Sequence, residues 1–115
     1  MSDIKNLTKK IIEFRDNRDW KQFHNPKDLA VSLALEATEV LELFQWKDKR
    51  EVEKYIKNNR EEIGEELADV LYWVLLLSHD LDINIAESFN QKMVKNEKKY
   101  PVNKAKGKHT KYNHL

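Results

Sequence analysis

Two pairs of acidic residues stand three positions apart, in stretches whose apolar residues recur at helical spacing. The pairs are Glu36 with Glu39 and Glu66 with Asp69. Residues three apart on a helix are neighbours on its surface, so each pair offers two carboxylates to one ligand. Mg²⁺, Mn²⁺ and Ca²⁺ prefer oxygen ligands, and Mg²⁺ often completes its coordination with water and substrate phosphates. The spacing therefore predicts a divalent-cation site that serves a nucleotide or another polyphosphate.

Other interpretations of these acids are weaker. A single glutamate on a helix is usually a solvated surface residue, and we interpret Glu61, Glu62 and Glu65 in that way. The two pairs instead border the apolar stripes of two long helices, where an unpaired carboxylate is costly to bury and no lysine is placed to neutralise it. None of the four histidines follows a glutamate by three positions, which excludes the Glu-x-x-His motifs of di-iron bundles.

The elements that must position the acids are helices. Helices are predicted over residues 3–18, 26–45, 49–57, 60–81 and 85–99. Asn25-Pro26 is a start signal, because asparagine caps a helix and proline suits its first position. Only two glycines and two prolines occur in 115 residues, too few for the turns of a sheet-rich fold. The sequence therefore predicts an all-α fold, a four-helix bundle with short links.

Apolar stripes orient the two acid-bearing helices. In residues 26–45 the stripe around Glu36 is Leu29, Leu33, Val40, Leu43 and Phe44. In residues 60–81 it is Ile63, Leu67, Val70, Val74, Leu77 and Leu81. The run Val70 to Leu77 is apolar almost all round, and we expect it to expose too much apolar surface for a lone bundle. A homodimer or a dimer-of-dimers tetramer is therefore predicted.

Charge and composition exclude several other classes of protein. The absence of cysteine excludes disulfide scaffolds and cysteine-ligated metals, and with a polar N-terminus and no membrane-length apolar run it favours a cytoplasmic protein. Residues 92–115 hold eight lysines against one acid, so we divide the chain into a helical domain over 1–102 and a basic, poorly ordered tail over 103–115. Apart from Tyr112, the tail lysines lack interleaved aromatics, which argues against nucleic-acid binding.

Four blocks of sequence, in this order, resemble the MazG-like all-α nucleoside triphosphate pyrophosphohydrolases, with the closest likeness to the dCTP pyrophosphatase branch. The blocks are RDWKQFHNPKDL (18–29), LEATEVLELFQWK (35–47), EELADVLYWV (65–74) and KMVKNEKKYP (92–101). The resemblance spans roughly residues 5 to 102. It implies an oligomeric helical bundle of that type.

The resemblance also implies particular roles. In the family, E-x-x-E followed by E-x-x-D holds Mg²⁺, for which Mn²⁺ is a possible substitute, and these positions are Glu36, Glu39, Glu66 and Asp69. It implies nucleotide contacts at Trp20, Trp46, Trp73, Lys92, Asn96 and Tyr100. Trp20 and Trp46 would wall the base pocket, contributed across a subunit interface. Spacing alone places Lys92 and Asn96 on one helix face, where a solvated basic face is the alternative.

The implied reaction is Mg²⁺-dependent hydrolysis of a dCTP-like (deoxy)nucleoside triphosphate to the monophosphate and pyrophosphate. As a hypothesis, Glu39 and Glu66 are the catalytic acids, with Glu39 orienting or deprotonating the water that attacks the α-phosphorus. Two alternatives remain open. One is a broad-specificity house-cleaning (d)NTP pyrophosphatase, and the other is a non-catalytic helical oligomerisation module.

Overall fold

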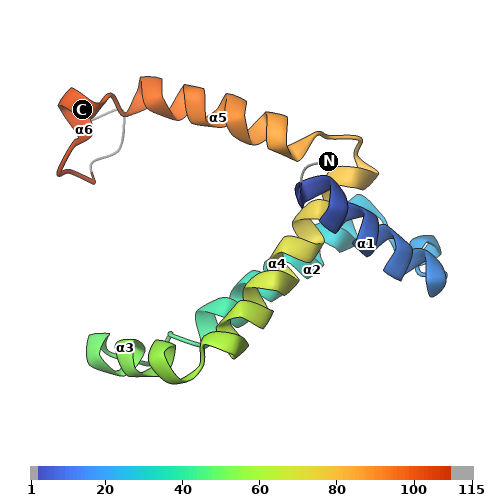
Figure 1. Ribbon diagram of the computed structural model, residues 1–115, viewed down its shortest axis with the longest axis horizontal. Helices are drawn as coiled ribbons and strands as arrows, with labels where there is room; N and C mark the ends of the chain where they lie inside the picture. The colour runs from blue at the N-terminus through green and yellow to red at the C-terminus, as the bar shows by residue number, and fades with distance from the viewer. Residues whose placement is uncertain (1–2, 110–115) are drawn as a thin grey trace. The chain divides into compact units, whose positions relative to one another are not determined.

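A computed structural model describes residues 3–109, and every regular element among these residues is helical (Figure 1). The elements are α1 (Asp3–Asn17), the 3₁₀ turn η1 (Lys21–Phe23), α2 (Pro26–Glu42), α3 (Lys49–Asn58), α4 (Arg60–Asp80), α5 (Ile85–Lys99) and α6 (Val102–Ala105). The all-α prediction is therefore confirmed.

Side-chain caps explain where three of these helices begin. The Oδ1 atom of Asn25 accepts a hydrogen bond from the backbone N–H of Asp28 at 2.9 Å, with Pro26 at the first position of α2 as predicted. Asp48 and Asn84 cap α3 and α5 in the same way. Each cap satisfies a backbone N–H that has no partner inside the helix.

The second long helix ends earlier than the sequence predicts. The prediction carried it to residue 45, whereas α2 ends at Glu42 and the chain turns over the next four residues. Lys47 Nζ donates to the carbonyl oxygen of Leu43 at 2.6 Å, and the same ammonium lies 4.5 Å from the ring centroid of Tyr55. A lysine that caps free carbonyls and stacks on the next helix stabilises this turn.

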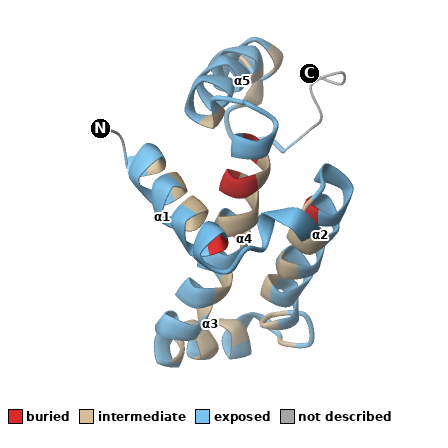
Figure 2. Cartoon of the chain, turned by 90° about the vertical axis from the view of Figure 1, so that its right-hand side faces the viewer, coloured by how far each residue is buried: buried red, intermediate tan, exposed pale blue. Residues whose placement is uncertain are grey.

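The chain divides into two compact units, Met1–Asp82 and Ile83–Leu115. In the first unit α2 and α1 pack against α4, and α3 contacts α4 (Figures 1 and 2). The second unit contains α5 and α6, and residues 110–115 of the predicted tail lie outside the described residues. The completion of a four-helix bundle by α5 and the division at residue 102 stay predictions.

The core of the first unit lies around the C-terminal half of α4 (Figure 2). Leu29, Leu75 and Leu76 are buried there, whereas Leu67 and Leu81, which were assigned to the predicted stripe, are 53% and 46% exposed. Within the single chain these two residues are therefore not buried as the stripe predicts, whereas α1 and α2 both pack on this helix and Leu75 and Leu76 are buried outside the predicted stripe. The run Val70 to Leu77 is thus largely covered within the chain.

The largest buried side chain in the described residues is charged. Arg15 is 1% exposed, and its two terminal nitrogens donate to the two carboxylate oxygens of Asp80 at 2.7 and 2.9 Å. The hydrogen bonds from Arg15 lower the pKa of Asp80, more than burial raises it. This ion pair joins the last turn of α1 to the last residue of α4.

None of the helices within residues 3–109 combines the length and the hydropathy needed to cross a bilayer. The cytoplasmic location stays a prediction.

Candidate metal centre and adjoining cavity

Three carboxylates from two helices converge in the first unit. Glu36 and Glu39 on α2 and Glu66 on α4 each offer an oxygen atom, and these oxygens all lie within 4.8 Å of one another. The convergence follows from the sequence, because α2 packs along α4 and the acids border the packed faces. The structure therefore brings together three of the four predicted ligands.

The surroundings of these carboxylates disfavour their charge. Glu36 and Glu66 are half-buried, and the Oε2 atom of each is buried without a hydrogen-bond partner. Burial raises the pKa of Glu36 and of Glu66, and hydrogen bonding to Glu39 and its charge raise both pKa values further. Within the described residues, no lysine or arginine forms an ion pair with the three glutamates.

A hard divalent cation fits this arrangement. Close carboxylates repel one another, and buried oxygen atoms without partners cost free energy unless something coordinates them. Oxygen-only ligation, with no neighbouring histidine or cysteine in the group, suits Mg²⁺ or Mn²⁺. These observations support the metal assignment on physical grounds.

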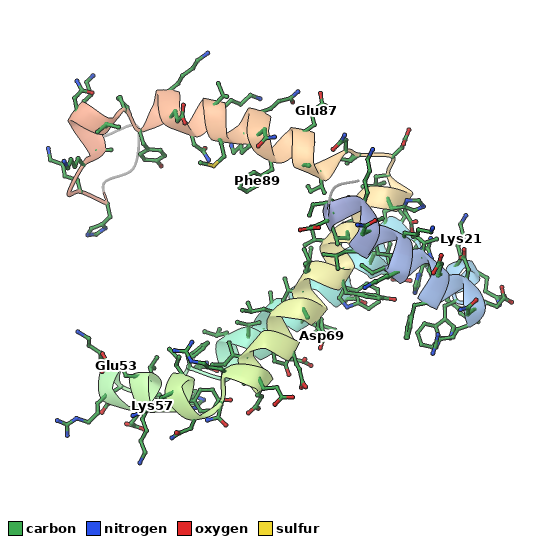
Figure 3. The ribbon with its side chains drawn as sticks, viewed as in Figure 1. Lys21, Glu53, Lys57, Asp69, Glu87 and Phe89 are labelled. Atoms are coloured by element: carbon green, nitrogen blue, oxygen red, sulfur yellow. The ribbon has the colours of Figure 1, made fainter. Side chains whose placement is uncertain are left out.

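The fourth predicted ligand lies beside this group. Asp69 is exposed and projects from α4 (Figure 3), and its charge contributes to the raised pKa values of Glu36 and Glu66. It falls outside the compact group of three oxygens and lines a neighbouring cavity instead. Asp69 thus stands between the acidic cluster and that cavity.

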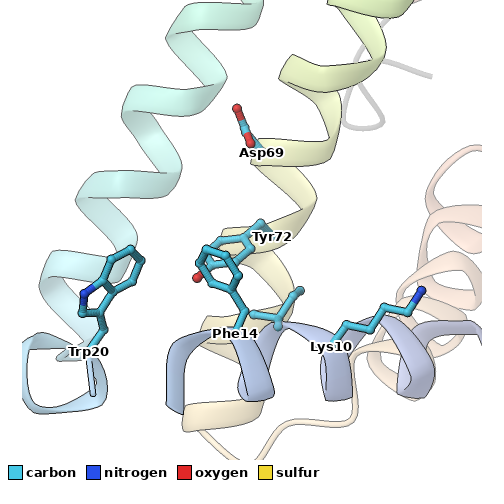
Figure 4. A pocket seen from close by; sticks show the side chains of 6 residues that line it. Lys10, Phe14, Trp20, Asp69 and Tyr72 are labelled. Carbon is cyan, nitrogen blue, oxygen red and sulfur yellow. The ribbon is translucent and has the colours of Figure 1, made fainter. Parts of the chain in front are cut away.

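The cavity has a volume of about 410 Å³, within the range of small-molecule sites. Its lining residues come from α1, η1's N-cap and α4: Lys10, Ile11, Phe14, Trp20, Asp69 and Tyr72 (Figure 4). Phe14 packs edge to face on Trp20 and on Tyr72, with ring centroids 5.7 and 6.3 Å apart. Aromatic rings, a carboxylate and a lysine side chain therefore line one space, with the nitrogen end of Lys10 directed away from the rings (Figure 4).

The predicted tryptophans occupy three different environments. Trp20 lines the cavity together with Asp69 of the same chain, so this contact needs no second subunit. Trp73 does not line the cavity; it packs between the rings of His24 and Tyr72, at 5.9 and 4.9 Å. Trp46 lies in the turn after α2 and is 86% exposed.

Three further predicted residues belong to the second unit. Lys92 and Asn96 lie on α5, and Tyr100 is its C-cap residue. Their contacts with a nucleotide stay a prediction.

Sequence reasoning missed most of the cavity wall. Ile11 and Phe14 stand at helical spacing in the first predicted helix, which indicates an apolar face and not a cavity wall, yet both line the cavity and Phe14 is 41% exposed. Lys10 and Tyr72 were not singled out. A signal for Tyr72 was available, because it follows Asp69 by three positions and so shares its helix face. No comparable signal existed for Lys10, because its place beside the cavity depends on how α1 packs on α4.

Comparison with known proteins agrees with this geometry. The MazG-like family matches residues 31–115, which include the whole acidic cluster. The chain is 35% identical to dCTP pyrophosphatase 1 of Mus musculus over 117 aligned residues, covering 100% of this chain and 67% of that protein. The chain belongs to the MazG-like family. The family and the enzyme class predicted from the sequence, a nucleoside triphosphate pyrophosphohydrolase, are thereby confirmed.

Two other similar proteins extend the comparison. dCTP pyrophosphatase 1 of Homo sapiens is 34% identical and is covered over 67% of its length. The crystal structure of a pyrophosphatase from Archaeoglobus fulgidus matches with a TM-score of 0.82 and 41% identity, covering 88% of this chain and 94% of that chain. The helical fold is therefore shared with a solved pyrophosphatase.

Proposed function

We propose that this protein hydrolyses dCTP, or a closely similar deoxynucleoside triphosphate, to the monophosphate and pyrophosphate. The observation that carries the proposal is the adjacency of two features. An acidic cluster suited to Mg²⁺ adjoins an aromatic-lined cavity of nucleoside size, and Asp69 belongs to the border of both. The dCTP pyrophosphatases that the chain resembles support the choice of base and sugar.

Glu36, Glu39, Glu66 and Asp69 would hold the metal, with Mn²⁺ as a possible substitute for Mg²⁺. When bound, the metal supplies positive charge to the phosphate oxygens and acidifies water. The unpartnered Oε2 atoms of Glu36 and Glu66 support their assignment as ligands, because coordination satisfies buried oxygens that nothing else does.

Glu39 is the exposed member of the cluster, so it is the carboxylate best able to orient a water molecule and accept its proton. In the cavity, the rings of Phe14, Trp20 and Tyr72 would stack on or enclose the base, since aromatic faces bind flat heterocycles. The ammonium group of Lys10 would offset phosphate charge at the same cavity. The family resemblance implies nucleotide contacts at four further residues, and we retain them in the proposal: Trp73, Lys92, Asn96 and Tyr100.

We also propose that the protein works as a homodimer or a dimer of dimers. The apolar surface that supports this proposal shares only Leu71 with the run Val70 to Leu77 predicted from sequence. Val31 and Leu35 on α2 are 49% and 61% exposed, and Leu67 and Leu71 on α4 are 53% and 39% exposed. Within each pair the residues are four apart and so lie along one helix face. A second copy of the chain would cover these apolar faces and the exposed ring of Trp46.

The decisive experiment measures pyrophosphate release from a panel of NTPs and dNTPs in Mg²⁺. It compares the wild-type protein with Glu66→Gln and with Glu65→Gln, a matched control at an exposed neighbour outside the cluster. We expect dCTP to be preferred, Glu66→Gln to lose at least about 100-fold in turnover, and Glu65→Gln to resemble wild type. Equal turnover of all substrates would establish the broad-specificity alternative. Full Mg²⁺-dependent turnover by folded Glu66→Gln would refute the proposed site.

A further inference from the structure

The two walls of the cavity come from different helices. Phe14 and Trp20 lie on α1 and just after it, whereas Asp69 and Tyr72 lie on α4 (Figure 4). The width of the cavity therefore depends on how α1 sits on α4. Hydrophobic packing alone would fix the position and angle of α1 on α4 only loosely, because apolar contacts have no preferred direction.

One directional contact joins these helices next to the cavity. Arg15 immediately follows Phe14, and Asp80 ends α4 about two turns beyond Tyr72. Their side chains form the bidentate ion pair described above, with Arg15 1% and Asp80 19% exposed. Two parallel hydrogen bonds to one planar carboxylate fix orientation as well as distance.

The backbone of the same arginine holds the turn that carries Trp20. The carbonyl oxygen of Arg15 accepts hydrogen bonds from the N–H groups of Arg18 and Trp20, both at 3.2 Å. Beyond η1, His24 Nδ1 lies 3.5 Å from Nη1 of Arg15. A residue fixed to Asp80 by its side chain thus anchors both Phe14 and Trp20 through its backbone.

We propose that Arg15 and Asp80 are positioning residues that set the geometry of the cavity. Neither side chain lines the cavity, so they act through Phe14 and Trp20. For catalysis the inference rests on the proposed function, because it assumes that the nucleotide enters this space. Stability alone does not require the pair, since apolar residues of similar volume often replace a buried ion pair without loss. Such a replacement keeps the fold while removing the directional contact.

The test uses the double variant Arg15→Met/Asp80→Leu, with Arg50→Met on the exposed surface of α3 as a matched control. We expect the double variant to fold, with a KM for dCTP raised roughly tenfold and kcat little changed. The indole N–H signal of Trp20 in NMR spectra, assigned with Trp20→Phe, should shift or broaden, while that of exposed Trp46 stays in place. Arg50→Met should match wild type in every measurement.

A folded double variant with wild-type KM and an unchanged Trp20 signal would overturn the inference. Failure of the wild-type protein to hydrolyse any nucleotide would refute the proposed function instead, and the Trp20 signal would still decide whether the pair positions the wall. Should the double variant not fold, Arg15→Lys serves the same test, because lysine keeps the charge but lacks the two-pronged geometry. Unchanged KM and Trp20 signal in Arg15→Lys would likewise overturn the inference.

Discussion

Glu36 and Glu66 face each other from separate helices, and each has a buried Oε2 atom without a hydrogen-bond partner. Both also have raised pKa values, caused first by burial and then by Glu39. The folded chain therefore keeps carboxylates where their charge is unfavourable until a cation neutralises it. The capacity of this cluster to bind a cation thus lowers the stability of the cation-free protein.

The first prediction is that Glu36→Gln stabilises the protein in EDTA. The neutral amide removes a repelling charge and can donate a hydrogen bond to the neighbouring carboxylates, a gain of about 1 kcal/mol. Thermal unfolding should shift upward by roughly 4 °C. With Mg²⁺ and a nonhydrolysable triphosphate, wild type should gain stability and the variant should gain little. Glu65→Gln is the control, and a variant less stable than wild type in EDTA would contradict the repulsion.

The second prediction concerns acid stability. The hydrogen bonds from Arg15 hold the pKa of Asp80 below its usual range, so the folded state binds this proton less readily than the unfolded state. The pair's stabilisation is therefore fully present above the unfolded pKa of about 3.9 and is lost as pH falls through the lower, folded pKa. Asp80→Asn leaves Arg15 without its charge partner and should cost about 3 kcal/mol at neutral pH.

Urea unfolding of wild type and Asp80→Asn at pH 7 and at pH 3 checks this sign. The difference in free energy of unfolding between wild type and Asp80→Asn should be smaller at pH 3 than at pH 7. A difference that is equal at both values, or larger in acid, would show that the ionised form of Asp80 is not what stabilises the fold.

The third prediction separates the cavity wall from exposed aromatics nearby. Trp20→Ala removes a ring that packs on Phe14 at the cavity, and we expect KM for the nucleotide to rise roughly tenfold with kcat largely retained. Phe23→Ala is the matched control, because Phe23 is 66% exposed in η1 and does not line the cavity. Steady-state kinetics of both variants test this prediction. An equal change of KM in the two variants would show that Trp20 does not contact the nucleotide.

The fourth prediction is that Trp46 serves the site of a partner subunit. Mixing Glu66→Gln subunits with Trp46→Ala subunits should restore activity that neither variant has alone, because one mixed site then has both residues. Mixing Glu66→Gln with Trp20→Ala subunits should restore nothing, since Trp20 lines the cavity of its own chain with Asp69. Pyrophosphate release before and after subunit exchange is the measurement, and absence of restoration with Trp46→Ala subunits would show that Trp46 does not serve the site of a partner subunit.

The acidic pairs were predictable from sequence because their geometry is local. A spacing of three on a helix fixes neighbours, and the adjoining apolar residues indicate which face packs, so the meeting of Glu36 with Glu66 followed once two helices were assigned. The Arg15–Asp80 pair was not predictable. These residues are 65 positions apart, and in the sequence each resembles an ordinary surface charge at a helix end.

Helix ends and exposure were predicted less well than helix existence. The early end of α2 depends on Lys47 reaching back to Leu43, a tertiary detail that apolar periodicity does not contain. Likewise, the burial of Leu75 and Leu76 outside the assigned stripe reflects two helices packing on α4 at once. The apolar pattern within one helix indicates which face is buried, whereas the number of helices packed against it decides how wide the buried face is.

The acidic residues on α2 and α4 are separated in the chain by the whole of α3. A ligand bound by both helices therefore acts as a reversible cross-link between distant parts of the chain. By mass action, copies saturated with ligand unfold less often than idle ones. Proteases act mainly on opened chains, so idle copies are degraded first. The lifetime of the protein would then follow the supply of what it binds, without a separate regulator.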